Sequence, residues 1–155
     1  MSGSEQGLGG RAILMVVLLL ISSHISLATQ AIDSRSTTVW SGTVTLPDGY
    51  TVSSQDILVV QEGTTIQLGD DKHIQVDGRV NFQGSENNPI IIESIFGNHD
   101  GIVFNQSSFN LGSRIENTTI NSAEFGITVY ASNPIISNVV VNNADRVAID
   151  LFDSA

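Results

Sequence analysis

Two stretches of the chain decide its predicted fold: Ile115-Glu-Asn-Thr-Thr-Ile-Asn-Ser-Ala123 and Ile136-Ser-Asn-Val-Val-Val-Asn-Asn-Ala144. They lie 21 residues apart and share an aliphatic residue, an Asn, a second aliphatic residue, a second Asn and an Ala. An alternating apolar segment follows each stretch, at residues 127–129 and 147–149. Repetition at a short period is typical of solenoids, in which each structural unit contacts only its neighbours.

Two weaker repeats occur upstream. Asn88-Pro-Ile-Ile91 recurs as Asn133-Pro-Ile-Ile136, 45 residues later, which is close to two turns of the same period. Ile57, Ile74 and Ile90 each open a pair of alternating strands, at steps of 17 and 16 residues. We therefore expect the early coils to be less regular than the later ones.

The composition after residue 31 favours strands over helices. Val, Ile and Thr dominate, and apolar residues alternate with polar ones in short runs separated by Gly, Asn, Asp and Ser. An all-β chain with a period near 21 predicts a right-handed parallel β-helix, in which like residues stack at the ~4.8 Å strand spacing. A β-sandwich is the alternative fold, and it would have antiparallel strands with no fixed period.

The repeated positions predict which side chains turn the chain and which fill the core. Because Asn tolerates left-handed backbone and its amides can stack, we interpret four residues as structural turns: Asn117, Asn121, Asn138 and Asn142. The alternation predicts that Ile115, Ile120, Ile127 and Val129 point inward, stacked over Ile136, Val141, Val147 and Ile149.

The N-terminus has the pattern of a secretory signal peptide, predicted at residues 1–28. Arg11 precedes ten apolar residues, 12–21, and small residues then place cleavage before Thr29 or Ile32. Ten residues are too few to span a bilayer as a helix, although an uncleaved anchor remains the alternative. We expect a secreted or cell-surface protein with a linker at 29–38 and a β-helix at 39–155.

Composition excludes several classes of function. The 155 residues carry a formal charge of −10, which argues against nucleic acid and against an anionic membrane surface as partners. Contact with a membrane is expected only through the signal segment, if that segment is uncleaved. The absence of Cys excludes disulfide scaffolds, zinc-thiolate sites and thiol nucleophiles.

Four segments resemble the opening of secreted right-handed parallel β-helix repeat proteins of the pectate-lyase-like fold. They are Trp40-Ser-Gly-Thr-Val-Thr-Leu46, Leu58-Val-Val-Gln-Glu-Gly-Thr-Thr-Ile66, Ile74-Gln-Val-Asp-Gly-Arg-Val80 and Gly84-Ser-Glu-Asn-Asn-Pro-Ile-Ile-Ile-Glu-Ser94. The resemblance implies an N-terminal strand that covers the first coil. It does not specify an activity, because this fold carries lyases, hydrolases, epimerases, adhesins and non-catalytic surface proteins.

The motifs that such enzymes use are mostly missing. Hydrolases similar to polygalacturonase carry Asn-Thr-Asp, Asp-Asp and Gly-His-Gly, and only Asp70-Asp71 is present, in a polar turn. Lyases of this fold hold calcium with several carboxylates beside an Arg base, for which Asp70, Asp71, Asp77 and Arg79 would be the candidates. Calcium needs six to eight oxygens, so we expect no cofactor, with calcium as the alternative.

The other candidate residues have simple structural explanations. His99-Asp100 could serve acid–base chemistry, but we interpret this pair as part of a surface loop. His73 with Asp71 could bind a metal, but no third ligand is in view. Trp40, the lone Trp, is expected to plug the open end of the helix. Two Asn-X-Ser/Thr sequons mark Asn105 and Asn117 as candidate N-glycosylation sites, with Asn105 the better acceptor.

These observations favour a non-catalytic extracellular or cell-surface scaffold, adhesin-like or carbohydrate-binding, with carbohydrate or surface proteins as partners. The alternative is a polysaccharide lyase or glycoside hydrolase of the same fold. About 127 residues at 21 per coil allow about five coils after the N-terminal cover strand. Because residues 147–151 still alternate as a core strand, we expect the β-helix to continue beyond residue 155.

Overall fold

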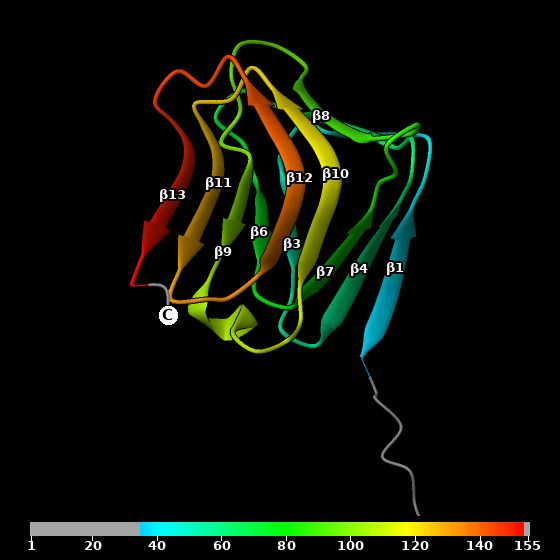
Figure 1. Ribbon diagram of the computed structural model, residues 1–155, viewed down its shortest axis with the longest axis vertical. Helices are drawn as coiled ribbons and strands as arrows, with labels where there is room; N and C mark the ends of the chain where they lie inside the picture. The colour runs from blue at the N-terminus through cyan, green and yellow to red at the C-terminus, as the bar shows by residue number, and fades with distance from the viewer. Residues whose placement is uncertain (1–34, 154–155) are drawn as a thin grey trace, which may run out of the picture. The chain divides into compact units, whose positions relative to one another are not determined.

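Residues 35–153, the part of the chain that the computed structural model describes, wind into a parallel β-solenoid (Figure 1). The expected signal peptide and most of the expected linker lie outside these residues. The first strand, β1 (Ser36–Trp40), begins three residues before the expected start of the β-helix at Val39.

Five coils follow one another along the solenoid, three with three strands and two with two longer strands. Coil 1 contains β1, β2 (Thr43–Leu46) and β3 (Tyr50–Val52); coil 2 contains β4 (Asp56–Gln61), β5 (Thr65–Leu68) and β6 (Ile74–Val76); coil 3 contains β7 (Arg79–Gln83), β8 (Ile90–Ser94) and β9 (Ile102–Phe104); coil 4 contains β10 (Arg114–Asn121) and β11 (Phe125–Tyr130); coil 5 contains β12 (Ile135–Asn142) and β13 (Val147–Phe152). A short 3-10 helix, η1 (Gln106–Ser108), stands between β9 and β10.

The strands form three faces of a prism. β1, β4 and β7 stack on the first face, β2, β5 and β8 on the second, and β3, β6, β9, β11 and β13 on the third. β10 pairs with β7 through its first half and with β8 through its second half, and β12 continues β10 over both faces. Each of these pairings is parallel, which confirms the β-helix and excludes the β-sandwich.

A single Asn turns the chain from the first face to the second in coils 4 and 5. Asn117 has φ 45° and Asn138 has φ 52°, so both have left-handed backbone, which Asn adopts more readily than most residues. Their side chains also bond along the stack, with Asn138 Nδ2 donating to Asn117 Oδ1 at 3.2 Å. A one-residue bend of this kind lets one long strand serve two faces.

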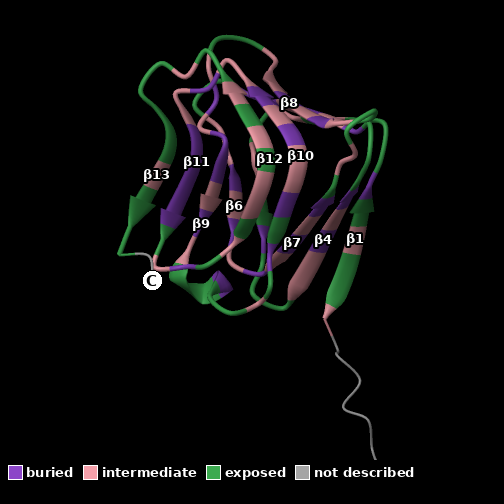
Figure 2. Cartoon of the chain, in the orientation of Figure 1, coloured by how far each residue is buried: buried purple, intermediate pink, exposed green. Residues whose placement is uncertain are grey.

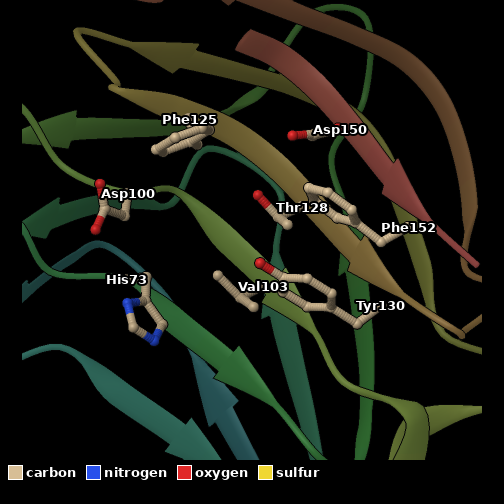
Figure 3. Close-up of a pocket in the computed structure, with 8 residues that line it drawn as sticks. All are labelled: His73, Asp100, Val103, Phe125, Thr128, Tyr130, Asp150 and Phe152. Carbon is tan, nitrogen blue, oxygen red and sulfur yellow. The ribbon is translucent and has the colours of Figure 1, made fainter. Parts of the chain in front are cut away.

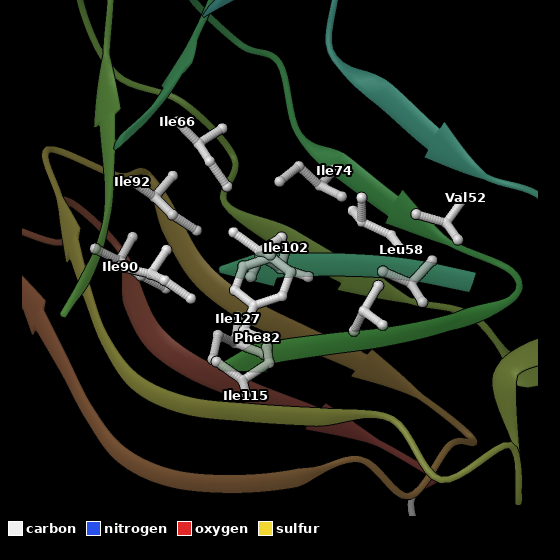
Figure 4. Close-up of a cluster of buried hydrophobic side chains, with 14 of the residues drawn as sticks. Val52, Leu58, Ile66, Ile74, Phe82, Ile90, Ile92, Ile102, Ile115 and Ile127 are labelled. Carbon is white, nitrogen blue, oxygen red and sulfur yellow. The ribbon is translucent and has the colours of Figure 1, made fainter. Parts of the chain in front are cut away.

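The core is a column of apolar side chains that point into the prism (Figure 4), and Figure 2 marks the buried positions along the strands. Period-two alternation puts every second residue inside, and burying one such side chain fully contributes roughly 1.5–3 kcal/mol. The residues with no exposed surface include Val60, Ile66, Leu68, Ile74, Val76, Val80, Phe82, Ile90, Ile92, Ile102, Phe104, Ile115, Ile120 and Ile127.

The expected stacking of coil 4 on coil 5 is confirmed on the first two faces and wrong by two residues on the third. Ile115 pairs with Ile136 and Ile120 with Val141, as expected. Ile127 pairs with Ile149 and Val129 with Leu151, rather than with Val147 and Ile149. The connection at 143–146 is longer than its equivalent at 122–124, so the offset grows from 21 to 22 residues.

The weaker upstream repeats do not correspond to stacked positions. Ile57, Ile74 and Ile90 lie in β4, β6 and β8, which belong to three different faces, so their steps of 17 and 16 are not coil lengths. The Asn-Pro-Ile-Ile echo is also not a structural repeat. Its first copy leads into β8 on the second face and its second copy leads into β12 on the first face.

Candidate functional site

The third face carries a groove lined by side chains of three strands, β9, β11 and β13, and of the connections that precede β6 and β9. Ile127 and Val129 point inward in β11, so Thr128 and Tyr130 point outward. The parallel register then places Asp150 beside Thr128 and Phe152 beside Tyr130. Val103 of β9 lies on the other side of Thr128.

These residues line a hollow of about 320 Å³ (Figure 3). Thr128 and Val103 form its floor, and Thr128 is only 6% exposed. Tyr130 and Phe152 stack with their ring centroids 4.9 Å apart and their planes at 14°, and both side chains remain more than 40% exposed. The complete lining is His73, Asp100, Val103, Phe125, Thr128, Tyr130, Asp150 and Phe152.

The groove combines aromatic surface with carboxylates and contains no Lys or Arg among its lining residues. The Arg146 guanidinium lies 5.7 Å from the ring centroid of Phe125, and Arg146 itself does not line the groove. Arg146 Nε also pairs with Glu124 Oε1 at 2.6 Å, which neutralises it. The lining of the groove therefore carries the carboxylates of Asp100 and Asp150 and no Lys or Arg, a composition that favours neutral or cationic ligands.

The structure separates the two members of the His99-Asp100 pair. His99 is fully buried, where its Nε2 lies 3.0 Å from the Asn121 carbonyl oxygen and its Nδ1 accepts a hydrogen bond from Gly101 N at 2.9 Å. Burial lowers the pKa of His99, against the opposing effects of the Asn121 carbonyl and the Asp100 carboxylate. Asp100 lines the groove instead. His99 is thus a core residue rather than the surface-loop residue that we expected.

The calcium candidates are not brought together. Asp77 accepts hydrogen bonds from Gln75 and Asn105 at 2.7 Å each and from Ser107 at 3.0 Å. Burial raises the pKa of Asp77, but these three bonds outweigh it and leave the pKa lowered. Asp70 accepts a bond from the backbone of Asn98 at 3.1 Å. Within residues 35–153 no group of three or more His, Asp or Glu side chains could hold a metal.

His73 and Asp71 have different surroundings. His73 lines the groove, whereas Asp71 is exposed with φ 55° at a turn. Trp40 packs in the core of coil 1, only 9% exposed, with its ring 4.8 Å from that of Tyr50 in an edge-on arrangement. It therefore covers the interior at the first coil, as a plug would.

The sequon residues already have hydrogen-bond partners in the folded chain. Asn105 Nδ2 and Ser107 Oγ both donate to the same oxygen of Asp77. Asn117 Nδ2 donates to the Gly84 carbonyl at 2.9 Å. Asn142 Nδ2 donates to Asn121 Oδ1 at 3.1 Å. This bond between coils 5 and 4 repeats the bond between Asn138 and Asn117, but at the far end of the same two strands.

Comparison with protein-family models, curated proteins and solved structures finds no match for this chain. Among residues 35–153 there is no helix that is long and apolar enough to cross a membrane.

Motifs within short segments of the sequence do not reveal the groove. Tyr130, Phe152 and Asp150 belong to two strands that are 22 residues apart and meet only in the stacked register. The polar and aromatic residues that alternate with the inward-pointing residues of β11 and β13 are a sequence signal for the groove. Those inward-pointing residues are Ile127, Val129, Ile149 and Leu151. Aligning β11 with β13 at the correct offset would have placed them side by side.

Proposed function

We propose that the protein is a non-catalytic binding scaffold of the cell exterior, and that the groove on its third face binds carbohydrate. The observation that carries the proposal is the stacked, exposed pair of Tyr130 and Phe152 beside Asp150 and the small Thr128. Flat aromatic rings pack against the apolar face of a sugar ring, and carboxylates accept hydrogen bonds from its hydroxyl groups. The N-terminal signal pattern supports an exterior location.

The charge of the site indicates which sugars it accepts. A chain of charge −10 whose groove contains Asp100, Asp150 and no lining Lys or Arg repels uronic acids and sulfated sugars. Neutral sugars and amino sugars meet no such repulsion, and an amino group gains an attraction to either carboxylate. We therefore infer a neutral or amino-sugar glycan as the ligand.

Titration calorimetry with three hexasaccharides tests this proposal: cellohexaose, the glucosamine hexamer of chitosan and hexagalacturonate. We expect binding of at least one of the first two and none of the third. Tyr130→Ala should weaken binding about tenfold, since one aromatic contact is worth roughly 1.4 kcal/mol. Phe109→Ala is the matched control, because Phe109 is 41% exposed, close to the 44% of Tyr130, and does not line the groove. Equal losses from both variants would contradict the proposal.

Two carboxylates in one groove also favour a second candidate function, a glycoside hydrolase or lyase. Asp100 and Asp150 both line the hollow, and pairs of carboxylates on either side of a sugar perform acid–base cleavage. The same oligosaccharides, incubated with the protein and separated by chromatography, distinguish the two functions. Products that disappear with Asp150→Asn would establish the enzyme, whereas intact oligosaccharide that still binds supports the scaffold.

A further inference from the structure

The two Asn-X-Ser/Thr sequons have different surroundings in the fold. Asn117 lies within the stack of coils, where its Nδ2 donates to the Gly84 carbonyl at 2.9 Å and its Oδ1 accepts from Asn138 Nδ2 at 3.2 Å. A sugar on this amide would compete with the contacts between neighbouring coils. Asn105 instead follows the last residue of β9, and Ser107 of its sequon is exposed. The fold therefore favours a glycan at Asn105 over one at Asn117.

The folded chain holds both side chains of the Asn105 sequon. Asn105 Nδ2 donates to Asp77 Oδ1 at 2.7 Å, and Ser107 Oγ donates to the same oxygen at 3.0 Å, so glycan transfer has to precede the docking of coil 3 on coil 2. In that transfer Nδ2 loses a proton and bonds to the anomeric carbon of a lipid-diphosphate-linked oligosaccharide, while the lipid diphosphate leaves with the electron pair of the broken C–O bond. One N–H remains on Nδ2. The glycosylated side chain thus keeps the donor that its bond to Asp77 requires.

Asn105 is the neighbour of Tyr130 in the stack of coils. Phe104 pairs with Val129 in parallel register, so the next residues along the chain, Asn105 and Tyr130, follow side by side. Both point outward, because Phe104 and Val129 before them are buried in the core. Tyr130 lines the groove (Figure 3) and is 44% exposed. A glycan on Asn105 therefore begins one strand spacing, ~4.8 Å, from the aromatic side of the groove.

Such a glycan belongs to the class of ligand that the groove is inferred to accept. The sugar that eukaryotic secretory pathways attach to Asn is N-acetylglucosamine, which is neutral and offers an apolar face to an aromatic ring. An attached ligand also has an advantage over a free one, because a short flexible tether gives it an effective concentration on the order of 1 mM. A groove that binds neutral sugars therefore binds its own glycan before it binds a dilute external one.

We propose that an N-glycan on Asn105 occupies the groove beside Tyr130 and excludes free oligosaccharides from it. The inference rests on the proposed function, because it takes the groove to be a site for neutral sugars. Glycosylation of Asn105 is then an autoinhibitory modification of the binding site. The chain that carries the glycan is closed to external ligands, and the chain that lacks it is open.

Secretion of the full chain from cultured mammalian cells tests the proposal, with two variants that each remove one sequon. Ser107→Ala removes the sequon of Asn105, and Thr119→Ala, the matched control, removes that of Asn117. Glycopeptide mass spectrometry should find Asn105 occupied in the unaltered chain and in Thr119→Ala. Titration calorimetry with cellohexaose and with the glucosamine hexamer should show binding at least about tenfold tighter for Ser107→Ala than for the other two chains. An unoccupied Asn105 in the unaltered chain, or equal affinities of the three chains, overturns the proposal.

The rate of glycan release tests the contact with Tyr130 without an external ligand. Peptide N-glycosidase cleaves the bond between Asn105 and its first sugar, and a glycan that packs in the groove is protected from this enzyme. Release from the folded protein should be faster for Tyr130→Ala than for the unaltered chain. It should be unchanged for Phe109→Ala, whose side chain is 41% exposed and does not line the groove.

The two measurements separate failure of this inference from failure of the proposed function. If Ser107→Ala binds neither hexasaccharide, the proposed function fails. If the release rates of Tyr130→Ala and the unaltered chain are equal, the glycan does not occupy the groove, and the inference is overturned whatever the calorimetry shows.

Discussion

His99 is held by two hydrogen bonds that suit only its neutral ring. Gly101 N–H donates to Nδ1, so the ring proton must be on Nε2, where it donates to the Asn121 carbonyl. A second proton on Nδ1 would face the Gly101 N–H and would also carry a charge into a fully buried position. The fold therefore selects one tautomer of this imidazole and opposes its protonation.

This arrangement predicts that acid destabilises the protein through His99. Its pKa in the folded chain is lowered below the ordinary 6.5, so the unfolded chain takes up the proton first as the pH falls. The contribution is fully present above about pH 6.5 and decreases below it, with a slope of at most about 1.4 kcal/mol per pH unit, until the folded pKa is reached. Urea denaturation at pH 7.5, 6.5 and 5.5 measures it.

His99→Asn is the control for this pH dependence, because its side chain is neutral and retains an acceptor oxygen. The variant should be less stable at pH 7.5 but should show a shallower decrease in the free energy of unfolding between pH 6.5 and 5.5. The same slope in both proteins would mean that other groups are responsible for the acid sensitivity.

At the level of the strand, the Ser113 side chain accepts a hydrogen bond from a backbone N–H of β7 that has no backbone acceptor in coil 4. Pairing of β7 with β10 begins at Asn81 and Arg114, so Val80, one residue earlier, has no strand partner in coil 4. Its N–H donates to Ser113 Oγ at 3.1 Å instead, and Ser113 is only 2% exposed. A side chain thus extends the ladder of hydrogen bonds by one residue.

Ser113→Ala should lower the free energy of unfolding by about 1–3 kcal/mol, because it leaves the buried Val80 N–H without an acceptor. Urea denaturation of the two proteins measures the difference. Ser41→Ala, at an exposed serine of coil 1, is the control and should change stability by less than about 0.5 kcal/mol. A loss below that limit for Ser113→Ala would show that water or a shifted backbone replaces the hydroxyl group.

The sequence was sufficient to predict the strands but not to assign each strand to a face of the prism. Alternation identified the inward residues of β10 and β11 because that pattern is local. Which strands stack depends on the lengths of the connections, and those vary: residues 84–89 and the η1 segment lengthen coil 3. The steps between Ile57, Ile74 and Ile90 therefore measured the distance between faces instead of the length of a coil.

The candidate site was harder to predict for the same reason. The aromatic pair and Asp150 arise from stacking across coils, and an error of two residues in register separates Tyr130 from Phe152. His99 was misjudged because Gly97 and Asn98 before it indicate a surface loop, whereas the following backbone folds over the ring. Patterns within a short stretch of sequence predict neither the stacking of Tyr130 on Phe152 nor the burial of His99.

At the level of the whole molecule, cleavage of the predicted signal peptide determines the residue at which the mature chain begins. Mass spectrometry of material secreted by an expressing cell should find an N-terminus at Thr29 or Ile32, the products of the two predicted cleavage sites. Either product retains the complete first strand, which begins at Ser36. Recovery of intact residues 12–21 from the membrane fraction would establish an anchored protein instead.

The corner between the first and second faces varies in length without disturbing the stack. It runs through residues 41–42 in coil 1, 62–64 in coil 2 and 84–89 in coil 3, and a single Asn closes it in coils 4 and 5. The strands on both sides remain in parallel register throughout. Residues 86–88, the exposed part of this corner, are thus a natural grafting position, where an epitope or a recognition loop could be displayed on a rigid support without redesign of the interior.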